Sequence, residues 1–146
     1  MNPVPPALGI DHGEARIGVA ASDALGLMAH PLETVSGKDP KAALARLAQI
    51  VRERKIEMLV FGLPRNMDGS HGPAAAKVKE FAAQLQALAP GCGQKFIDER
   101  LTSVAAQKAL HESGRNAKQS RGVIDQVSAQ LILQVWLDQQ AMLAGQ

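Results

Sequence analysis

Acidic residues occupy three places in this sequence where a carboxylate is unusual. Asp11, Asp98 and Glu99 each follow a short apolar run, and Asp125 lies near the start of a long apolar helix expected over residues 123–137. Carboxylates that converge without a Lys or Arg partner repel one another and lose hydration, so they usually need a divalent cation. These residues therefore predict metal-assisted phosphoryl chemistry, provided that the fold brings them together.

Each acidic residue also has a purely structural interpretation. Asp11 fits a hairpin turn in which it binds nearby amides, and Asp125 fits a cap in the first turn of its helix. Arg100 fits an ion pair with Asp98 or with Glu99. If the strand continues through these two acids, they point to opposite faces, so that one binds metal while the other serves the structure. The sequence leaves open which acid does which.

Four further side chains near the strand ends suit contacts with a nucleic-acid substrate. Arg16, Arg65 and Arg100 carry guanidinium groups that match phosphate, and Asn66 suits either orienting a ligand or bracing its own loop. Gly18 lets the backbone approach a phosphate or a metal closely. An ordinary strand-to-helix connection with an exposed arginine is the alternative for the loop of Arg65 and Asn66.

The remaining polar residues favour a hard metal ion. The four histidines show no two-histidine spacing for zinc, and carboxylate ligands without His or Cys favour Mg²⁺ or Mn²⁺. A basic cluster before the last helix suits a phosphate backbone or a solvated loop about equally. Its members are Arg115, Lys118 and Arg121.

The size and composition indicate one globular domain. The 146 residues are enough for one core and leave little room for a second, and 46% of them are hydrophobic and 21% charged. The net charge of +2 permits a polyanionic partner without requiring one. We expect a single domain over residues 1–146, with the proline-rich residues 1–6 as a loose tail.

The cysteine content and the terminus favour the cytoplasm. Cys92 is the only cysteine, which excludes an internal disulfide and any two-cysteine metal spacing. The N-terminus lacks the basic and apolar regions of a signal peptide, and no apolar stretch approaches the ~20 residues of a membrane helix. We therefore expect a cytoplasmic protein with no membrane partner.

The spacing of apolar residues predicts five strands and four helices. Strands are expected where short continuous or alternating apolar runs occur, at residues 7–11, 16–22, 27–35, 58–63 and 94–98. Pro31 places the third strand at an edge or a bend. Helices are expected at residues 40–51 with Asp39 as N-cap, at 73–88, at 103–113 and from near residue 120, after a polar loop at 114–119.

This order of elements is that of the ribonuclease H-like fold. The first three strands are antiparallel because their connections are short, and right-handed crossovers then add two strands and place helices on both faces of a mixed sheet. The first, fourth and fifth strands run parallel in this α/β fold. Their carboxyl ends share one edge, where open α/β sheets bind ligands.

Four sequence blocks resemble the YqgF family, which is also described as Holliday-junction-resolvase-like proteins and as pre-16S ribosomal RNA nucleases. The resemblance runs from residue 9 to about residue 137. Its blocks are GIDHGEARIGVA from Gly9, GLPRNMDG from Gly62, DERLT from Asp98 and IDQVSA from Ile124. Arg65 departs from the apolar residue that the family has before the asparagine.

The resemblance implies a metal-dependent nuclease that trims the 5′ end of the 16S rRNA precursor. It implies an acidic site made of Asp11, Asp98, Glu99 and Asp125. Our hypothesis is two-metal phosphodiester hydrolysis, in which Asp11 bridges two Mg²⁺ or Mn²⁺ ions while Asp125 and one of the paired acids complete their shells.

Three other functions are alternatives. A DNA junction resolvase would cut branched DNA as a homodimer with two facing sites. A noncatalytic RNA-binding factor of ribosome assembly would still bind after chelation or loss of the acids. An actin-like nucleotide binder needs two lobes, whereas 146 residues supply one. The sequence leaves open RNA against DNA, and monomer against homodimer.

Overall fold

The computed structural model describes residues 4–66, 68–102 and 117–145, with side chains from residue 123 onward in the last range. Within these ranges every expected strand is present, with ends no more than two residues from those predicted. The strands are β1 (Ala7–His12), β2 (Arg16–Ser22), β3 (Ala29–Ser36), β4 (Met58–Leu63) and β5 (Gly93–Asp98). The helices are α1 (Pro40–Arg54), α2 (Pro73–Leu88), the short 3₁₀ turn η1 (Glu99–Leu101) and α4 (Ala117–Ala144).

The last helix begins earlier than expected. The sequence predicts a polar loop at 114–119, but α4 already includes residues 117–119. Ala117, Lys118 and Gln119 are all good helix formers, so their polarity does not end the helix. Residues 114–116 and the helix expected at 103–113 lie outside the described residues.

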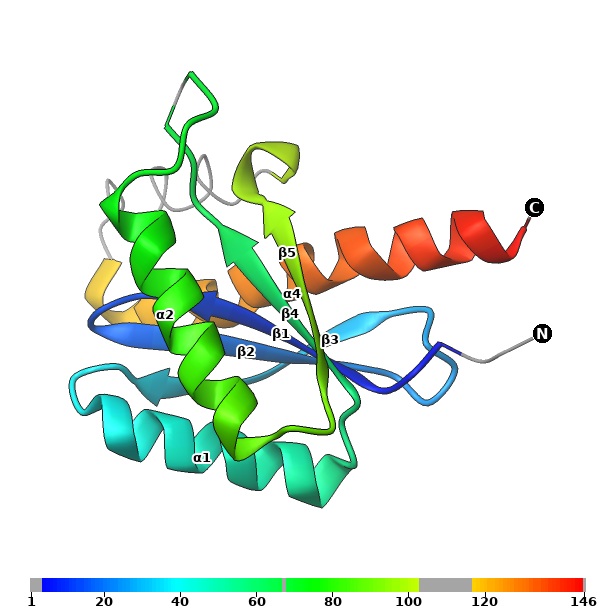
Figure 1. The fold of residues 1–146 in the computed structure, drawn as a ribbon, viewed down its shortest axis with the longest axis horizontal. Helices are drawn as coiled ribbons and strands as arrows, with labels where there is room; N and C mark the ends of the chain where they lie inside the picture. The colour runs from blue at the N-terminus through cyan, green and yellow to red at the C-terminus, as the bar shows by residue number, and fades with distance from the viewer. Residues whose placement is uncertain (1–3, 67, 103–116, 146) are drawn as a thin grey trace.

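The strands form one mixed sheet in the order β3-β2-β1-β4-β5. The pairs β1–β2 and β2–β3 are antiparallel, whereas β1–β4 and β4–β5 are parallel. This arrangement confirms the predicted ribonuclease H-like sheet. The carboxyl ends of β1, β4 and β5 therefore lie along one edge, and the loop after β4 projects there together with η1 (Figure 1).

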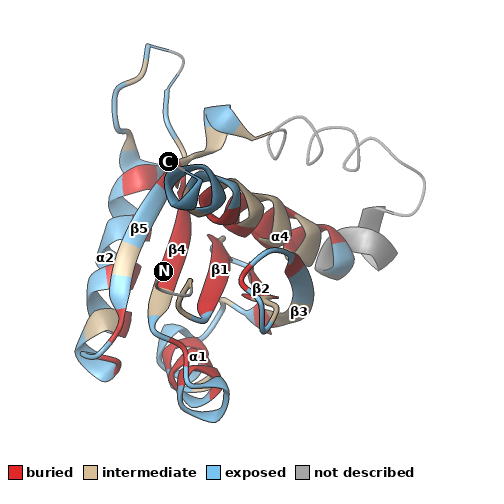
Figure 2. Ribbon diagram, turned by 90° about the vertical axis from the view of Figure 1, so that its right-hand side faces the viewer, coloured by how far each residue is buried: buried red, intermediate tan, exposed pale blue. Residues whose placement is uncertain are grey.

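Helices cover both faces of the sheet, as predicted. Helices α1 and α2 pack on one face and α4 on the other (Figure 2). Helices α1 and α2 each bury apolar residues at helical spacing. In α2 the buried residues end at Leu85, and Leu88 in the last turn is 52% exposed. Asp39 caps α1 as expected, because its Oδ1 accepts a hydrogen bond from Ala42 N at 3.3 Å.

Strand β3 forms one edge of the sheet, in agreement with the prediction from Pro31. The register between β2 and β3 shifts between Val19 and Ala20, and Pro31 pairs with Ala20 just after the shift. Proline has no amide hydrogen to donate, so an edge strand with a local irregularity tolerates it. Within the described residues, none of the helices combines the length and hydrophobicity that a membrane span requires.

Candidate active site

Asp11 lies on the α4 side of the sheet near the end of β1. Ile10 belongs to the core under α1 and α2, whereas Ala7 belongs to the core under α4. Alternation along the strand therefore directs Asp11 toward α4. The residue is only 3% exposed. A carboxylate buried to this extent has lost most of its hydration, which is costly for folding.

Gly18 lies beside Asp11 on β2 and lets α4 approach the sheet. The two residues are partners in the antiparallel register. A Cβ at Gly18 would overlap the backbone carbonyl of Asp125, so a larger residue would push the helix away. Gly18 therefore makes room for the backbone of α4. As a result, α4 carries Asp125 to a point one strand away from Asp11.

Gly62 occupies the corresponding place on β4, on the other side of Asp11. It follows Phe61, which is the parallel partner of Ile10. The Glu99 Oε1 lies 3.1 Å from the point where a Cβ on Gly62 would stand. Glu99 starts η1 after β5, so its side chain reaches over β4, the strand between β5 and β1. Asp11 and Glu99 therefore face the same side of the sheet across Gly62.

The role of Gly62 was not foreseen from the sequence. A glycine inside an otherwise apolar strand often marks a close approach by another group, and this signal was present in the run 58–63. The approaching groups here are the Glu99 carboxylate and the side chain of Ile132 on α4. Sequence spacing alone does not say which residue will approach.

Asp98 makes different contacts from its neighbour Glu99. Its carboxylate accepts hydrogen bonds from Arg100 Nε at 3.0 Å and Nη2 at 2.7 Å, and Arg65 Nε lies 3.5 Å away. The hydrogen bond from the Arg100 side chain is the main cause that lowers the pKa of Asp98. The ion pair considered for Arg100 is therefore present, and its partner is Asp98.

Asp125 forms an ion pair with Arg16 on β2. Arg16 Nε donates to Asp125 Oδ2 at 2.8 Å, and the two side chains are 38% and 13% exposed. The ion pair compensates the carboxylate of a residue that is only 9% exposed on α4. The expectation that the acids gain no arginine partner is wrong for Asp125, because Arg16 reaches it from β2, a pairing that the sequence did not reveal. For Asp98 the structure confirms the alternative that the sequence offered, an ion pair with Arg100.

The acidic residues have the chemistry that a hard divalent cation prefers, but their side chains are not grouped around one point. All their donors are carboxylate oxygens, which Mg²⁺ and Mn²⁺ prefer. In the part of the chain that the structure describes, no three His, Cys, Asp or Glu side chains are close enough to hold a metal ion. Asp11 and Glu99 face one side of the sheet, while Asp125 is bound to Arg16.

The loop after β4 is tied to the same edge of the sheet. Asn66 Nδ2 donates to Ser70 Oγ at 3.0 Å, so Asn66 braces the loop. Arg65 Nη1 donates to the Gly69 carbonyl at 3.1 Å, and its Nε faces Asp98. Gly69 has φ +87°, a conformation that favours glycine. Arg65 and Arg100 therefore meet at one carboxylate between the loop and η1.

His12 lies on the opposite face from the acids. Its ring packs against Phe81 of α2, with 4.6 Å between the centroids. Burial, and then the charge of Lys77, lower the pKa of His12. The residue that follows Asp11 thus belongs to the packing under α2 and not to the acidic group.

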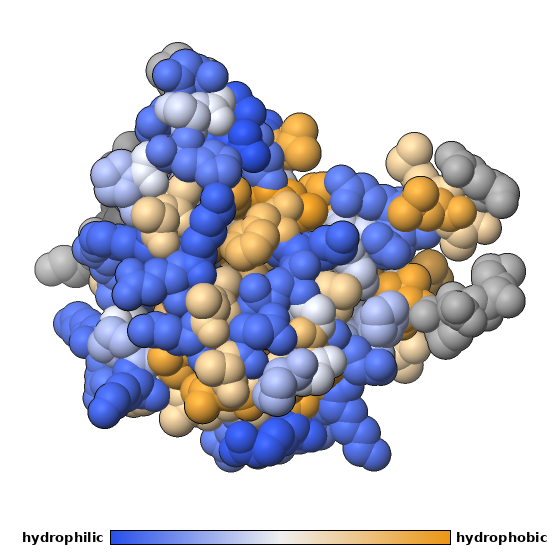
Figure 3. All heavy atoms as spheres, in the orientation of Figure 1, coloured by the Kyte–Doolittle hydropathy of each residue, from blue (hydrophilic) through white to orange (hydrophobic). Residues whose placement is uncertain are grey.

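A groove of about 390 Å³ begins beside Asp98 and runs between β5 and the end of α4. Figure 3 shows a mostly hydrophilic face on which apolar side chains gather where β5 runs. Lys95 and Arg65 line this groove, whereas the ring of Phe96 stacks on Phe61 on the opposite face of the sheet, with 5.6 Å between the centroids. Cationic side chains along a groove match the phosphate backbone of a nucleic acid.

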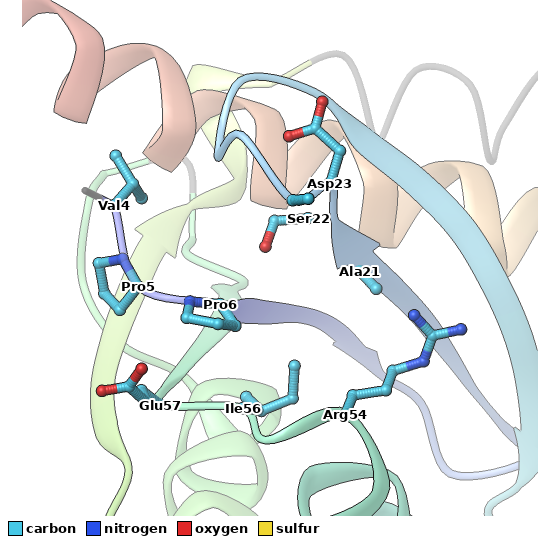
Figure 4. Close-up of a pocket in the computed structure, with 10 residues that line it drawn as sticks. Val4, Pro5, Pro6, Ala21, Ser22, Asp23, Arg54, Ile56 and Glu57 are labelled. Carbon is cyan, nitrogen blue, oxygen red and sulfur yellow. The ribbon is translucent and has the colours of Figure 1, made fainter.

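A separate hollow of about 500 Å³ lies at the opposite end of β1 and β4 (Figure 4). Two of its polar side chains bind the backbone of the chain itself: Ser22 Oγ accepts from Ala7 N, and Asp23 Oδ1 accepts from Leu27 N, both at 2.9 Å. Open α/β sheets bind ligands at the carboxyl ends of their strands, whereas this hollow lies at the amino ends. The acidic edge therefore remains the candidate site.

Comparisons with known proteins agree on one family. The family model described as RuvX, Holliday junction resolvase, matches residues 6–139. A protein from Moorella thermoacetica named "Putative pre-16S rRNA nuclease" is 49% identical over 131 residues, which cover 90% of this chain and 93% of that protein. A protein of the same name from Streptomyces avermitilis is 46% identical over 131 residues, covering 90% of this chain and 84% of that protein.

Solved structures share the fold at low identity. RuvC from T. thermophilus, in complex with a Holliday junction substrate, gives a TM-score of 0.60 at 13% identity and covers 94% of this chain and 97% of its own. A fowlpox virus resolvase with Holliday junction DNA gives 0.53 at 7% identity, covering 92% and 98%. At such identities the likeness concerns the fold alone.

Proposed function

Because the chain belongs to the RuvX family, we propose that it is a metal-dependent nuclease that hydrolyses phosphodiester bonds. RuvX is the family that the four sequence blocks resemble, and it is also named YqgF. The proposed substrate is the 5′ end of pre-16S rRNA, since relatives about 46–49% identical carry the name of pre-16S rRNA nuclease. We also propose that the protein works in the cytoplasm, because the proposed substrate is a ribosomal RNA precursor.

The observation that supports this proposal is that acids from three separate segments lie on one side of the sheet, over three adjacent strands. Asp11 lies near the end of β1, Glu99 lies over Gly62 of β4, and the backbone of Asp125 on α4 packs against Gly18 of β2. All three lie on the α4 side. A folding core alone gives no reason to gather carboxylates there, because their burial and mutual repulsion oppose folding.

Each acid then has a distinct role. Asp11, Glu99 and Asp125 would hold Mg²⁺ or Mn²⁺, whose chemistry when bound is to activate water and to neutralise charge on the leaving oxygen. Asp98 is a positioning residue, since it fixes the guanidinium groups of Arg100 and Arg65. This division favours Glu99 over Asp98 as the metal ligand.

The arginines supply contacts to the phosphates that flank the cleaved bond. Arg65 and Arg100 share the single carboxylate of Asp98, which leaves guanidinium hydrogens of the pair for a phosphate. Asn66 keeps the loop of Arg65 in shape. The groove along β5 then offers Lys95 to the phosphates on one side of the site.

A cleavage assay tests the proposal. Purified protein is given a fragment of pre-16S rRNA that contains the mature 5′ end, with Mg²⁺, with Mn²⁺ or with EDTA. We expect cleavage with either metal, none with EDTA, and none by Asp11→Asn. The matched control is Asp138→Asn, which changes an exposed carboxylate on α4 and should cleave normally. Full activity of Asp11→Asn would discard the site.

A four-way DNA junction in the same assay addresses the second candidate, a junction resolvase. The description of the matching family model favours testing this activity. If a stable homodimer makes paired cuts in the junction and leaves the RNA intact, the function is junction resolution and not RNA processing. RNA binding that survives both EDTA and Asp11→Asn, without cleavage, would instead indicate a noncatalytic assembly factor.

A further inference from the structure

The Arg16–Asp125 ion pair engages a carboxylate that the proposed function assigns to the metal ion. Arg16 and Gly18 are two residues apart on β2, so both lie on the α4 side. Gly18 is the register partner of Asp11 and contacts the backbone of Asp125. The guanidinium of Arg16 is therefore held on Asp125 on the same face as Asp11, two residues along β2 from the register partner of Asp11.

The two partners differ in their freedom to move. Asp125 is anchored on α4, packed against the sheet, and its side chain is 13% exposed. The side chain of Arg16 is long and 38% exposed, so it can leave the pair and remain hydrated. A carboxylate bound to a guanidinium must release it before the same oxygen binds a metal ion. Such a release would move the arginine and leave the helix in place.

We propose that Arg16 occupies the place of a divalent cation on Asp125 in the metal-free protein, and leaves it when the cation binds. This inference rests on the proposed function, because it takes Asp125 as a metal ligand. Arg16 neutralises the buried carboxylate while no ion is present. Once displaced, its guanidinium is available beside the site for a phosphate of the substrate.

Displacement has a measurable consequence for metal affinity. In the wild-type protein, a cation that binds Asp125 must break the ion pair, which reduces its apparent affinity. Arg16→Gln removes this competitor, so Mn²⁺ should bind about two- to fivefold more tightly, as expected for a partly exposed pair. A role of Arg16 in folding alone would leave the affinity unchanged or lower it.

The experiment is titration of metal-free protein with Mn²⁺, followed by calorimetry, without nucleic acid. The matched control is Arg46→Gln, which breaks the Arg46–Glu33 pair at 2.7 Å, with side chains 37% and 30% exposed, away from the acids. We expect a lower Kd only for Arg16→Gln. An unchanged or higher Kd in folded Arg16→Gln would overturn the proposal.

Two further variants separate the possible failures. Arg16→Lys keeps the charge, so it serves if Arg16→Gln does not fold, and its Kd should lie between that of the wild type and a value about fivefold lower. Asp125→Asn should weaken Mn²⁺ binding. If it binds like the wild type, Asp125 is no ligand and the displacement model fails, even where the wild type cleaves RNA. If the wild type cleaves no RNA but Arg16→Gln binds Mn²⁺ more tightly, the nuclease function fails and the displacement model stands.

Discussion

The carboxylate of Glu99 lies over Gly62, with its Oε1 3.1 Å from the place of the Cβ that this glycine lacks. The contact joins η1 to the end of β4, one strand away from Asp11. It places the second acid of the pair on the α4 side, while the first acid, Asp98, is bound to arginines. The position of Glu99 therefore depends on the absence of a side chain at residue 62.

Gly62→Ala tests this dependence. The new Cβ would press on Glu99 and overlap the end of the Ile132 side chain, so we expect a destabilisation of about 1–3 kcal/mol. Displacement of Glu99 should also lower the cleavage rate roughly tenfold or more. Urea unfolding and the RNA cleavage assay measure the two effects. Gly91→Ala is the control, because no atom lies within 4 Å of its Cβ position. Normal cleavage by Gly62→Ala would show that the place of Glu99 does not matter.

The two neighbouring acids should respond differently to loss of charge. Glu99→Gln removes a proposed metal ligand, so cleavage should fall more than ~100-fold and Mn²⁺ should bind more weakly. Asp98→Asn only loosens Arg100 and Arg65, so cleavage should fall about tenfold, mainly through KM, with unchanged Mn²⁺ affinity. Cleavage rates and Mn²⁺ titration distinguish the two variants. The opposite result would make Asp98 the ligand and Glu99 the positioning residue.

The contrast between these acids marks what the sequence can predict. Periodicity located the strand ends and the buried face of α4, because backbone geometry repeats every two or 3.6 residues. It therefore identified Asp11 and Asp125 as carboxylates directed inward. The Arg16–Asp125 pair joins residues 109 positions apart, and its formation depends on how α4 docks on β2. No local pattern encodes that docking.

The acid dependence of stability should reveal the Asp98 ion pair. Arg100 lowers the pKa of Asp98 below its ordinary value of 3.8. The carboxylate therefore stabilises the folded protein fully above that value, and this contribution is lost as the pH falls through the lower pKa of the folded state. Urea unfolding at pH 7 should find Asp98→Asn less stable than wild type, and the difference should shrink below about pH 4. A difference that stays constant with pH would mean that the charge of Asp98 is irrelevant to stability.

Gly18→Ala should be more damaging than Gly62→Ala. The obstacle at Gly62 is the end of a flexible side chain, whereas at Gly18 it is the backbone carbonyl of Asp125. Relief requires movement of α4 itself, so we expect a loss of about 3 kcal/mol or more in unfolding free energy. Urea unfolding of both variants gives the comparison. Equal or smaller damage at Gly18 would mean that α4 docks less tightly than this contact indicates.

Asp11→Asn should separate function from folding. The side chain is 3% exposed, and a neutral amide of the same size is easier to bury than a carboxylate. Without metal, the variant should therefore be as stable as the wild type or more stable by up to ~2 kcal/mol. Addition of Mn²⁺ should stabilise the wild type by binding to the folded state, and the variant much less. Thermal unfolding with and without Mn²⁺ measures both effects, with Asp138→Asn as the control that follows the wild type. A variant that unfolds much more easily in both conditions would identify Asp11 as a structural residue, because a metal ligand is dispensable for folding when no metal is present.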